Sequence, residues 1–376
     1  MSGGYFESVR RVVVKVGSAV LCDEGQRLDR RIVQSLVKQL SELKRRGIEV
    51  VLVSSGAVAT GMEILGMEKA PATLTQKQAV AALGQGQLIA TYAELFRKAG
   101  IVSAQILLTH ADLADRERYL NAKHAIQALL DLHIIPIVNE NDTVSVEEIK
   151  FGDNDRLGAL CAALVEADLL IVLSDIDALY TADPKRDPTA TRVARVETIT
   201  DELMAAAGGR GSGIGTGGMA TKIAAIRDLT QRGIPALIAG GKQPGIISQL
   251  FAGKELGTYF PPSVDPLAAR KHWIAYTLKH RGRVHVDEGA YLALRDGGKS
   301  LLAVGVVRVE GDFRVGDAVS IIAPSGQEVA RGLVSYSSVE LREVCGRRTH
   351  EIDGVLGYCP APSVIHRDDL VLLGSI

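Results

Sequence analysis

Acidic and amide side chains are concentrated in residues 139–155 of this chain. The stretch reads Asn-Glu-Asn-Asp-Thr-Val-Ser-Val-Glu-Glu-Ile-Lys-Phe-Gly-Asp-Asn-Asp, and its apolar alternation predicts a short hairpin that folds residues 139–142 back toward residues 153–155. Carboxylates bind an ammonium group, whereas amide side chains and loop N–H groups bind a carboxylate. The cluster therefore favours a small ligand that carries both charges. The alternative is a pair of polar turns that cap strands and a helix.

A glycine-rich run precedes a lysine at the start of a predicted helix. Residues 212–222 read Ser-Gly-Ile-Gly-Thr-Gly-Gly-Met-Ala-Thr-Lys. This composition lets backbone N–H groups approach phosphate oxygens, while Lys222 adds a full positive charge. A dinucleotide-binding loop would follow a strand, but residues 201–207 look helical, and the chain contains no P-loop string. The run predicts a phosphate site of another kind, and a flexible surface loop is the alternative.

A lysine also interrupts the first apolar strand. The run Arg-Val-Val-Val-Lys-Val predicts a strand over residues 11–16 that contains Lys15. A buried ammonium needs an anionic partner, so Lys15 is expected to emerge at the strand end or to face a bound phosphate. An edge-strand lysine that discourages aggregation is the alternative. Small polar residues end three other predicted strands, at Ser55, Asn139 and Ser174. Ligands of open parallel sheets bind beyond the carboxyl ends of the strands, so these residues should converge.

Strands and helices alternate over the first two thirds of the chain. Strands are expected at residues 11–16, 49–53, 102–108, 134–138, 169–173 and 234–239, and helices at residues 29–46, 76–98, 116–130, 156–166 and 219–232. The strands are apolar on both faces, which indicates a mainly parallel sheet that is covered on both sides. The sequence therefore predicts an α/β fold built as a three-layer sandwich.

The pattern changes near residue 260. The run Phe-Pro-Pro-Ser-Val-Asp-Pro at residues 260–266 predicts a linker or a domain edge. Beyond about Arg281, short alternating runs and glycine-rich turns replace the long helical periods, which predicts a small, mostly β domain. We expect an α/β domain at residues 1–262, a linker at residues 263–280 and the small β domain at residues 281–376.

Composition and charge limit the classes of protein to which this chain can belong. The chain has 376 residues, 47% of them hydrophobic, and its 43 Lys plus Arg against 44 Asp plus Glu give a formal net charge of -1. A length of about 150 residues per domain predicts two folded domains. The balanced charge argues against nucleic acid or an anionic membrane as partner. No apolar run reaches the ~18 residues of a membrane span, and the first residues do not resemble a secretory signal, so we expect a cytoplasmic protein.

The cysteines and histidines show no spacing typical of metal ligands. Cys22, Cys161, Cys345 and Cys359 form no C-x-x-C pair, which argues against a zinc site or a disulfide scaffold. The eight histidines form no H-x-x-x-H pair. We therefore predict no residue of this chain as a metal ligand.

Six short motifs, taken together, resemble the amino acid kinase family. They are Lys-Val-Gly-Ser at residues 15–18, Ser-Ser-Gly-Ala at 54–57, Val-Asn-Glu-Asn-Asp at 138–142, Gly-Asp-Asn-Asp at 152–155, Tyr-Thr-Ala-Asp-Pro at 180–184 and Gly-Thr-Gly-Gly-Met-Ala-Thr-Lys at 215–222. The pairing of Asn-Glu-Asn-Asp with Gly-Asp-Asn-Asp is specific to the members that phosphorylate glutamate. Residues 281–369 resemble a PUA domain, including Gly-Tyr at 357–358 and His-Arg-Asp-Asp at 366–369.

The resemblance implies the amino acid kinase fold and ATP-dependent phosphorylation of the side-chain carboxylate of L-glutamate, the first step toward proline. ATP and Mg²⁺ are the implied cofactors, with Mg²⁺ bridging the ATP phosphates. A carboxylate is already ionised near neutral pH and needs no general base, whereas its repulsion from the γ-phosphate calls for cations. The resemblance also implies feedback inhibition by proline and a homo-oligomer, with a tetramer suspected.

The resemblance assigns roles residue by residue. Lys15 and Lys222 would hold the transferring phosphoryl group, and Asp155 would position these two lysines. The glutamate-binding positions are Ser55, Asp142 and Asn154, with Asn139 as a further candidate. The nucleotide site corresponds to Lys15, Ser174, Asp175, Thr216, Gly217, Gly218, Met219, Ala220, Thr221 and Lys222.

Two other functions compete with this interpretation. Another kinase of the same fold, acting on acetylglutamate, aspartate, carbamate or a nucleotide, would share the strand-end motifs. An RNA-binding protein is the second, because PUA domains elsewhere bind RNA. Residues 281–376, however, contain 11 Lys plus Arg against 13 Asp plus Glu, so their net charge is 11 - 13 = -2. Without a basic stripe, RNA is not expected as a partner.

Overall fold

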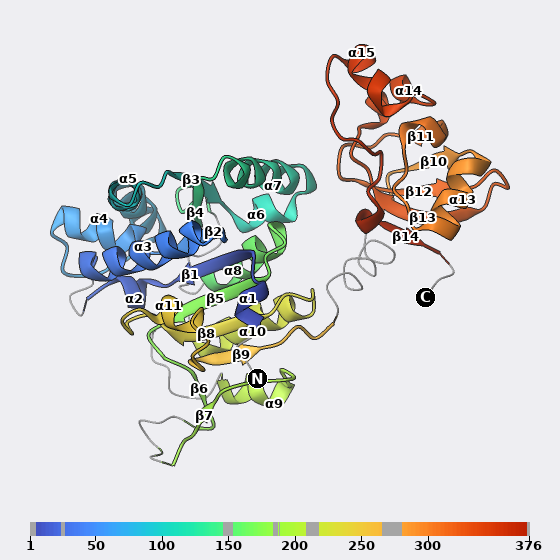
Figure 1. The fold of residues 1–376 in the computed structure, drawn as a ribbon. Coiled ribbons are helices and arrows are strands. Elements are labelled where there is room, and N and C mark those ends of the chain that lie inside the picture. The colour runs from blue at the N-terminus through green and yellow to red at the C-terminus, as the bar shows by residue number, and fades with distance from the viewer. Residues whose placement is uncertain are drawn as a thin grey trace. The chain divides into compact units, whose positions relative to one another are not determined.

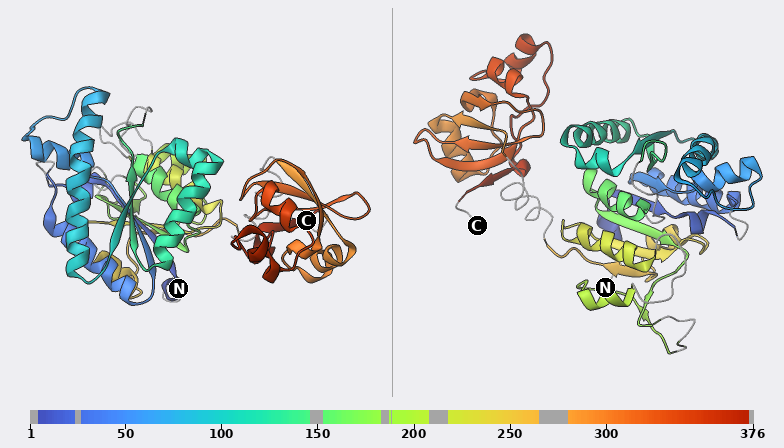
Figure 2. Two further views of the ribbon diagram at one scale, coloured as in Figure 1. Left: turned by 90° about the horizontal axis from the view of Figure 1, so that it is seen from above. Right: turned by 180° about the vertical axis from the view of Figure 1, so that it is seen from behind.

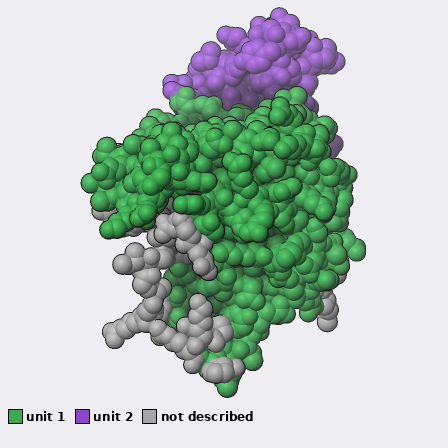
Figure 3. Space-filling view, turned by 90° about the vertical axis from the view of Figure 1, so that its left-hand side faces the viewer, with its two compact units in different colours: residues 1–263 green, residues 264–376 purple. Residues whose placement is uncertain are grey.

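The computed structural model describes residues 5–23, 27–145, 153–182, 187, 189–207, 218–264 and 280–373 (Figure 1). The chain divides into two compact units, residues 1–263 and 264–376, which are green and purple in Figure 3. Each unit has its own buried hydrophobic residues. Most of the predicted linker lies outside the described residues, and the predicted domain bounds stay a prediction.

A seven-stranded sheet forms the centre of the first unit. Its strand order is β3-β4-β2-β1-β5-β8-β9, and all neighbouring pairs are parallel except β8 with β9. The strands are β1 (Arg11–Val16), β2 (Glu49–Ser54), β3 (Ser103–Leu108), β4 (Ile135–Glu140), β5 (Leu169–Ser174), β8 (Ala236–Gly240) and β9 (Thr258–Phe260). The predicted α/β class and mainly parallel sheet are confirmed.

Each central strand contributes side chains to two cores. Val12, Val14 and Val16 of β1 belong to one buried cluster, whereas Val13 belongs to the other. Successive side chains of a strand point to opposite faces, so a strand that is apolar throughout fills the cores on both sides of the sheet. Lys15 follows Val14 and therefore points to the same face as Val13. This alternation determines which helices the lysine can meet.

Helices cover both faces of this sheet and complete the three predicted layers (Figure 2). The face of Val12 packs against α1 (Tyr5–Ser8), α2 (Ser18–Leu21), α3 (Arg30–Arg45), α4 (Ala57–Leu65), α5 (Leu74–Lys98) and α11 (Ile246–Leu250). The face of Val13 packs against α6 (His110–Ala114), α7 (Arg116–Asp131), α8 (Asp153–Leu164), α9 (Asp201–Ala207) and α10 (Met219–Thr230). Lys15 thus faces the layer that contains α8 and α10.

Helix α8 begins earlier than the sequence predicted. It starts at Asp153 rather than at residue 156, because acidic residues are stabilised in the first turn of a helix by the helix dipole. Asn154 and Asp155 therefore lie on a helix instead of on a loop. The predicted hairpin falls mainly on residues 146–152, which lie outside the described residues. A short antiparallel pair, β6 (Leu179–Tyr180) with β7 (Arg192–Val193), was not predicted.

The second unit contains a five-stranded sheet in the order β11-β10-β12-β13-β14. The strands are β10 (Gly282–Val286), β11 (Val306–Gly311), β12 (Ala318–Ile322), β13 (Glu328–Leu333) and β14 (Leu370–Leu372). Helices α13 (Glu288–Gly297), α14 (Ser338–Val344) and α15 (Ile352–Leu356) accompany it, with short η2 (Ala303–Gly305), η3 (Thr349–Glu351) and η4 (Arg367–Asp369). The prediction of a mainly β domain is confirmed, although α13, α14 and α15 were missed because such short helices show little periodicity.

Candidate active site

Lys15 is buried at the centre of the sheet. Strand β1 lies between β2 and β5, so the alternative of an edge-strand lysine is wrong. The side chain reaches toward the carboxyl end of its strand, because a Cβ atom built on Gly17 would lie 3.3 Å from Nζ of Lys15. That end of a parallel sheet is where ligands bind. The lysine is thus buried along its stem and directed at the ligand-binding edge.

Asp155 is the partner of this ammonium. Nζ of Lys15 donates a hydrogen bond of 2.6 Å to Oδ1 of Asp155, and both side chains are buried. Gly158, one turn further along α8, lets the helix approach β1 closely, since a Cβ atom there would lie 3.1 Å from the side chain of Lys15. Positions three apart lie on one face of a helix. The glycine therefore brings Asp155 within reach of the strand.

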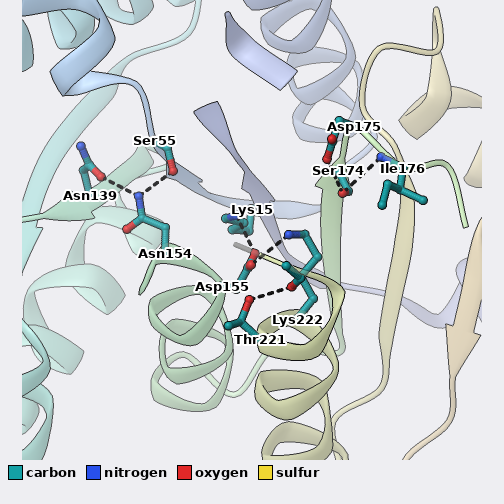
Figure 4. Close-up of polar contacts among 11 residues, drawn as sticks. Lys15, Ser55, Asn139, Asn154, Asp155, Ser174, Asp175, Ile176, Thr221 and Lys222 are labelled. Carbon is teal, nitrogen blue, oxygen red and sulfur yellow. Dashed lines mark hydrogen bonds and ion pairs between the residues drawn. The ribbon is translucent and has the colours of Figure 1, made fainter. Parts of the chain in front are cut away.

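Lys222 approaches the same carboxylate from α10. Its Nζ lies 3.2 Å from Oδ2 of Asp155, within ion-pair distance, but the contact does not meet hydrogen-bond geometry. Only 7% of Lys222 is exposed. Figure 4 shows both lysine side chains pointing at Asp155 from different elements. One carboxylate thus holds two ammonium groups close together, an arrangement suited to an anion with several oxygens.

The pKa of Lys15 reflects its burial and its charged neighbours. Burial of the ammonium lowers the pKa of Lys15 below its ordinary value. The positive charge of Lys222 acts in the same direction, whereas the charge and hydrogen bond of Asp155 oppose the shift. Desolvation disfavours the charged form of a buried lysine, and a nearby anion favours it. An anionic ligand beside both lysines would therefore stabilise their charged forms.

An amide cluster adjoins the lysine pair. Nδ2 of Asn154 donates to Oγ of Ser55 at 2.7 Å and to Oδ1 of Asn139 at 3.1 Å (Figure 4). Oδ1 of Asn154 is buried and has no hydrogen-bond partner among the described residues. A buried acceptor without a partner is costly, so this oxygen is suited to receive a donor such as a ligand ammonium.

The remaining predicted amino-acid contact, Asp142, follows β4. It lies half-buried in the turn at residues 142–144. This turn continues into Ser145, whose Oγ donates to Oε1 of Glu140 at 3.0 Å. The polar residues after β4 therefore form an ordered turn near the carboxyl edge of the sheet, as expected from the order of the strands.

The predicted nucleotide residues lie at two places. Ser174 ends β5, next to β1; its Oγ donates to Oδ1 of Asp175 at 3.1 Å and accepts from the backbone N–H of Ile176 at 3.3 Å.

The second place is the start of α10. Gly218 precedes this helix, and its carbonyl oxygen accepts from Oγ1 of Thr221 at 2.8 Å. Met219 and Ala220, half-buried, form the first turn of α10 with Thr221 and Lys222. Thr216 and Gly217 lie outside the described residues.

Two side chains that contact this site were missed at the sequence level. Oε1 of Gln85 accepts from Nδ2 of Asn139 at 2.7 Å, and the hydroxyl of Tyr92 lies 2.9 Å from Oγ of Ser54. Both belong to α5, which lies on the opposite face of the sheet from α8. An available signal was the spacing of polar side chains along the predicted helix at residues 76–98.

The described residues form neither a metal-binding cluster nor a membrane-spanning helix. Within the described residues, no group of three or more His, Cys, Asp and Glu side chains could hold a metal ion. None of the helices in the described part of the chain is long and apolar enough to cross a membrane.

Models of two protein families match this chain. A model of the amino acid kinase family matches residues 10–240, and a PUA domain model matches residues 282–356. This protein belongs to the amino acid kinase family. It is 50% identical to glutamate 5-kinase of Trichlorobacter lovleyi over 99% of both chains. It is 49% identical to glutamate 5-kinase of Pelobacter propionicus, over 98% of this chain and 99% of the other. The structure of UMP kinase from Bacillus anthracis is similar over 68% of this chain and 97% of its own, with 17% identity and a TM-score of 0.47.

Proposed function

We propose that this protein transfers the γ-phosphoryl group of ATP to the side-chain carboxylate of L-glutamate and forms L-glutamyl 5-phosphate, the first step toward proline. The relatives that match over nearly the whole chain are glutamate 5-kinases. One structural observation supports the assignment most directly. Asn154 and Asp155 are consecutive, and they face an amide cluster and a lysine pair respectively. An amino-acid site would therefore adjoin a phosphoryl site.

The chemistry that this arrangement must support is a direct displacement. A carboxylate oxygen of glutamate forms a bond to the γ-phosphorus, and the bond from that phosphorus to the β,γ-bridging oxygen breaks. ADP leaves with the electron pair. The side chain of glutamate has a reference pKa of about 4.3, so it is ionised near neutral pH and no proton has to be removed. The protein has to align the reactants and offset their negative charge.

We propose that the two lysines offset the negative charge of the reactants. Lys15 and Lys222 would contact the transferring phosphoryl group from two sides, and Asp155 would keep both ammonium groups in place through its two oxygens. Charge contacts that strengthen in the transition state typically account for a factor of about 100 or more in turnover. Asp155 is then a positioning residue for the lysines, because its carboxylate already occupies the space between them.

Glutamate would bind in the amide cluster. We assign its ammonium group to the open Oδ1 of Asn154 and to Asp142, with Ser55 and Asn139 completing the polar wall. The nucleotide would bind along Ser174, Asp175 and the segment from Thr216 to Lys222. The first turn of α10 follows Gly218, which provides no side-chain cap. The N–H groups of Thr221 and Lys222 donate to the carbonyl oxygen of Gly218, so we assign those of Met219 and Ala220 to phosphate oxygens.

The residues of this site are compatible with Mg²⁺ that binds together with the nucleotide. The described residues offer no cage of three or more acidic or imidazole ligands, and Mg²⁺ bound to ATP commonly uses phosphate oxygens, water and few protein carboxylates. Asp155 and Asp175 both act electrostatically on Lys15, so these carboxylates lie close enough to the proposed phosphate site to assist in holding the cation. When bound, the cation would neutralise part of the phosphate charge.

Substrate choice can be tested in one assay. The protein would be incubated with ATP, Mg²⁺ and hydroxylamine, together with L-glutamate, N-acetyl-L-glutamate or L-aspartate. Hydroxylamine converts an acyl phosphate into a hydroxamate, and ADP release reports turnover independently. We expect both products with L-glutamate alone. Equal or faster turnover of N-acetyl-L-glutamate or L-aspartate would reassign the protein to another member of the family.

The resemblance also supports regulation, assembly and location. We propose feedback inhibition by proline, a homo-oligomer of tetrameric size and a cytoplasmic location. Titration of activity with proline and light scattering of the purified protein test the first two. Salt-sensitive retention of RNA by the full chain would support an RNA-binding role instead, which the net negative charge of residues 281–376 disfavours.

A further inference from the structure

One face of helix α5 contacts three parts of the proposed glutamate site. Gln78, Gln85 and Tyr92 follow one another at intervals of seven residues. An α-helix has 3.6 residues per turn, so positions seven apart lie almost directly above one another, with a drift of only ~20° per step. The three side chains therefore form a polar row along α5.

Each member of the row meets a different segment. Nε2 of Gln78 donates to the carbonyl oxygen of Ser145 at 2.9 Å, in the turn after β4. Oε1 of Gln85 accepts from Nδ2 of Asn139 at 2.7 Å, at the end of β4. The hydroxyl of Tyr92 lies 2.9 Å from Oγ of Ser54, at the end of β2. A single helix thus contacts both strand ends that carry the proposed amino-acid contacts.

The hydrogen bonds in this network have defined directions. Ser54 has one hydroxyl hydrogen, which it donates to the carbonyl oxygen of Ser55 at 3.0 Å. Tyr92 must therefore donate to Ser54. These two hydrogen bonds connect Tyr92, through Ser54, to the backbone carbonyl oxygen of Ser55. Tyr92 is fully buried, so water cannot replace its hydroxyl.

The amide chain is directional as well. Asn139 uses Oδ1 to accept from Asn154 and Nδ2 to donate to Gln85. Gln85 therefore selects the orientation of the Asn139 amide, and Asn139 selects that of Asn154. With Nδ2 of Asn154 committed to Ser55 and Asn139, its oxygen is the end left for a ligand. A reversed amide would present a donor to the ligand ammonium and repel it.

We propose that Gln78, Gln85 and Tyr92 are positioning residues for the amino-acid substrate, and that α5 serves as the rigid support of the glutamate site. The inference rests on the proposed function, because it concerns the binding of the same substrate. It assigns to Gln85 and Tyr92 an effect on glutamate affinity that reaches the ligand through Asn139, Asn154 and Ser55. Gln78 would act through the turn at Ser145. The hydrogen bonds of this row go to Ser145, Asn139 and Ser54 and not toward the lysine pair, so the phosphoryl chemistry should be unaffected.

The test is a split between kinetic constants. Gln85→Leu removes the acceptor of Asn139, and we expect the KM for glutamate to rise about tenfold while kcat and the KM for ATP stay within about threefold. Tyr92→Phe should raise the KM for glutamate by about threefold to tenfold. Gln87→Leu is the matched control, because Gln87 is exposed on the same helix, and it should match the parent protein.

A double variant shows the route of the effect. If Gln85 acts through Asn139, Asn139→Ala combined with Gln85→Leu should have the same KM for glutamate as Asn139→Ala alone. A KM for glutamate that stays within twofold in both Gln85→Leu and Tyr92→Phe, while Asn154→Ala raises it, overturns the role of α5. If Asn154→Ala itself leaves the KM for glutamate unchanged, the result contradicts the proposed glutamate site and not only the role of α5. Should Gln85→Leu not fold, Gln85→Met provides the same measurement with a side chain of similar length.

Discussion

Gly84 on helix α5 and Gly61 on helix α4 touch backbone to backbone. A Cβ atom added to Gly84 would collide with the backbone of Gly61 and with the carbonyl oxygen of Ala57. Helix α4 begins directly after Ser55 and Gly56, whose φ of 112° requires a residue without a side chain. The glycine contact therefore determines how closely the strand end at Ser55 approaches the row of polar side chains on α5.

Gly84→Ala should destabilise the first unit. Two helices packed through their backbones have no room for a methyl group, and overpacking of this kind costs about 1 to 3 kcal/mol. Gly86→Ala is the matched control on the same helix, since nothing lies within 4 Å of a Cβ atom there. That substitution should stabilise by roughly 0.5 to 1 kcal/mol. Thermal inactivation of kinase activity measures both changes, and equal inactivation temperatures for the two variants would contradict the close contact.

Lys222→Ala should slow the chemical step. The substitution removes one of the two ammonium groups beside Asp155, and we expect kcat to fall by at least about 100-fold with only a modest change in the KM for glutamate. Steady-state kinetics with both substrates provide the measurement. Lys38→Ala, on the exposed side of α3, controls for the loss of a lysine and should behave as the parent. Near-normal turnover of Lys222→Ala would remove this residue from the proposed mechanism.

Asp142→Ala should weaken glutamate binding. The half-buried carboxylate lies in the turn after β4, where it would meet the ammonium group of the substrate. Loss of a charge-assisted contact is worth roughly tenfold or more in affinity. We expect that rise in the KM for glutamate while the KM for ATP stays constant. Asp131→Ala, at the exposed end of α7, is the control, and an unchanged KM for glutamate in Asp142→Ala would show that the acidic turn is misassigned.

The cysteines should differ in reactivity. Burial raises the pKa of Cys161 to about 12 and that of Cys22 to about 11. Only the thiolate is alkylated, and a raised pKa lowers the thiolate fraction at every pH below it. In the folded protein at about pH 8.5, iodoacetamide should therefore modify the exposed Cys359 before either buried thiol.

Peptide mass spectrometry at successive times separates these sites. Denaturation in urea should make all four cysteines reactive, which confirms that access was limiting. Cys359→Ser should remove the fast phase and leave the two buried thiols unmodified. Rapid alkylation of Cys161 in the folded protein would mean that the core around α8 opens readily.

Removal of the second unit should preserve phosphoryl transfer. All the proposed contacts to glutamate and the nucleotide lie within residues 1–263, which form a compact unit. Truncation after Ser263 retains the hydrogen bond from its backbone N–H to the carbonyl oxygen of Thr230 at 2.9 Å. We expect turnover within about threefold of the full chain. Loss of activity in a folded truncated protein would show that the second unit takes part in catalysis, and its proline response and mass would report on regulation and assembly.

Local patterns were sufficient to predict much of the fold. The continuous apolar runs that became β1, β2 and β5 predicted buried parallel strands, because only a strand covered on both faces has apolar side chains at every position. The start of α8 was misplaced, since Asn and Asp are equally typical of turns and of first helical turns. Helix α13 and the β6–β7 pair were missed, because short elements carry too few residues to show a period.

The sequence by itself determined which groups were available for chemistry: a lysine that had to be buried in a strand, a second lysine after a glycine run, and a crowd of acids and amides between them. Tertiary structure alone decided that Lys15 and Lys222 share Asp155, and that Gln85 on the opposite side of the sheet orients Asn139. The physical reason is that periodicity reports which face of an element is buried, whereas partners far apart in the chain are chosen by strand order and by the close approach that glycines permit.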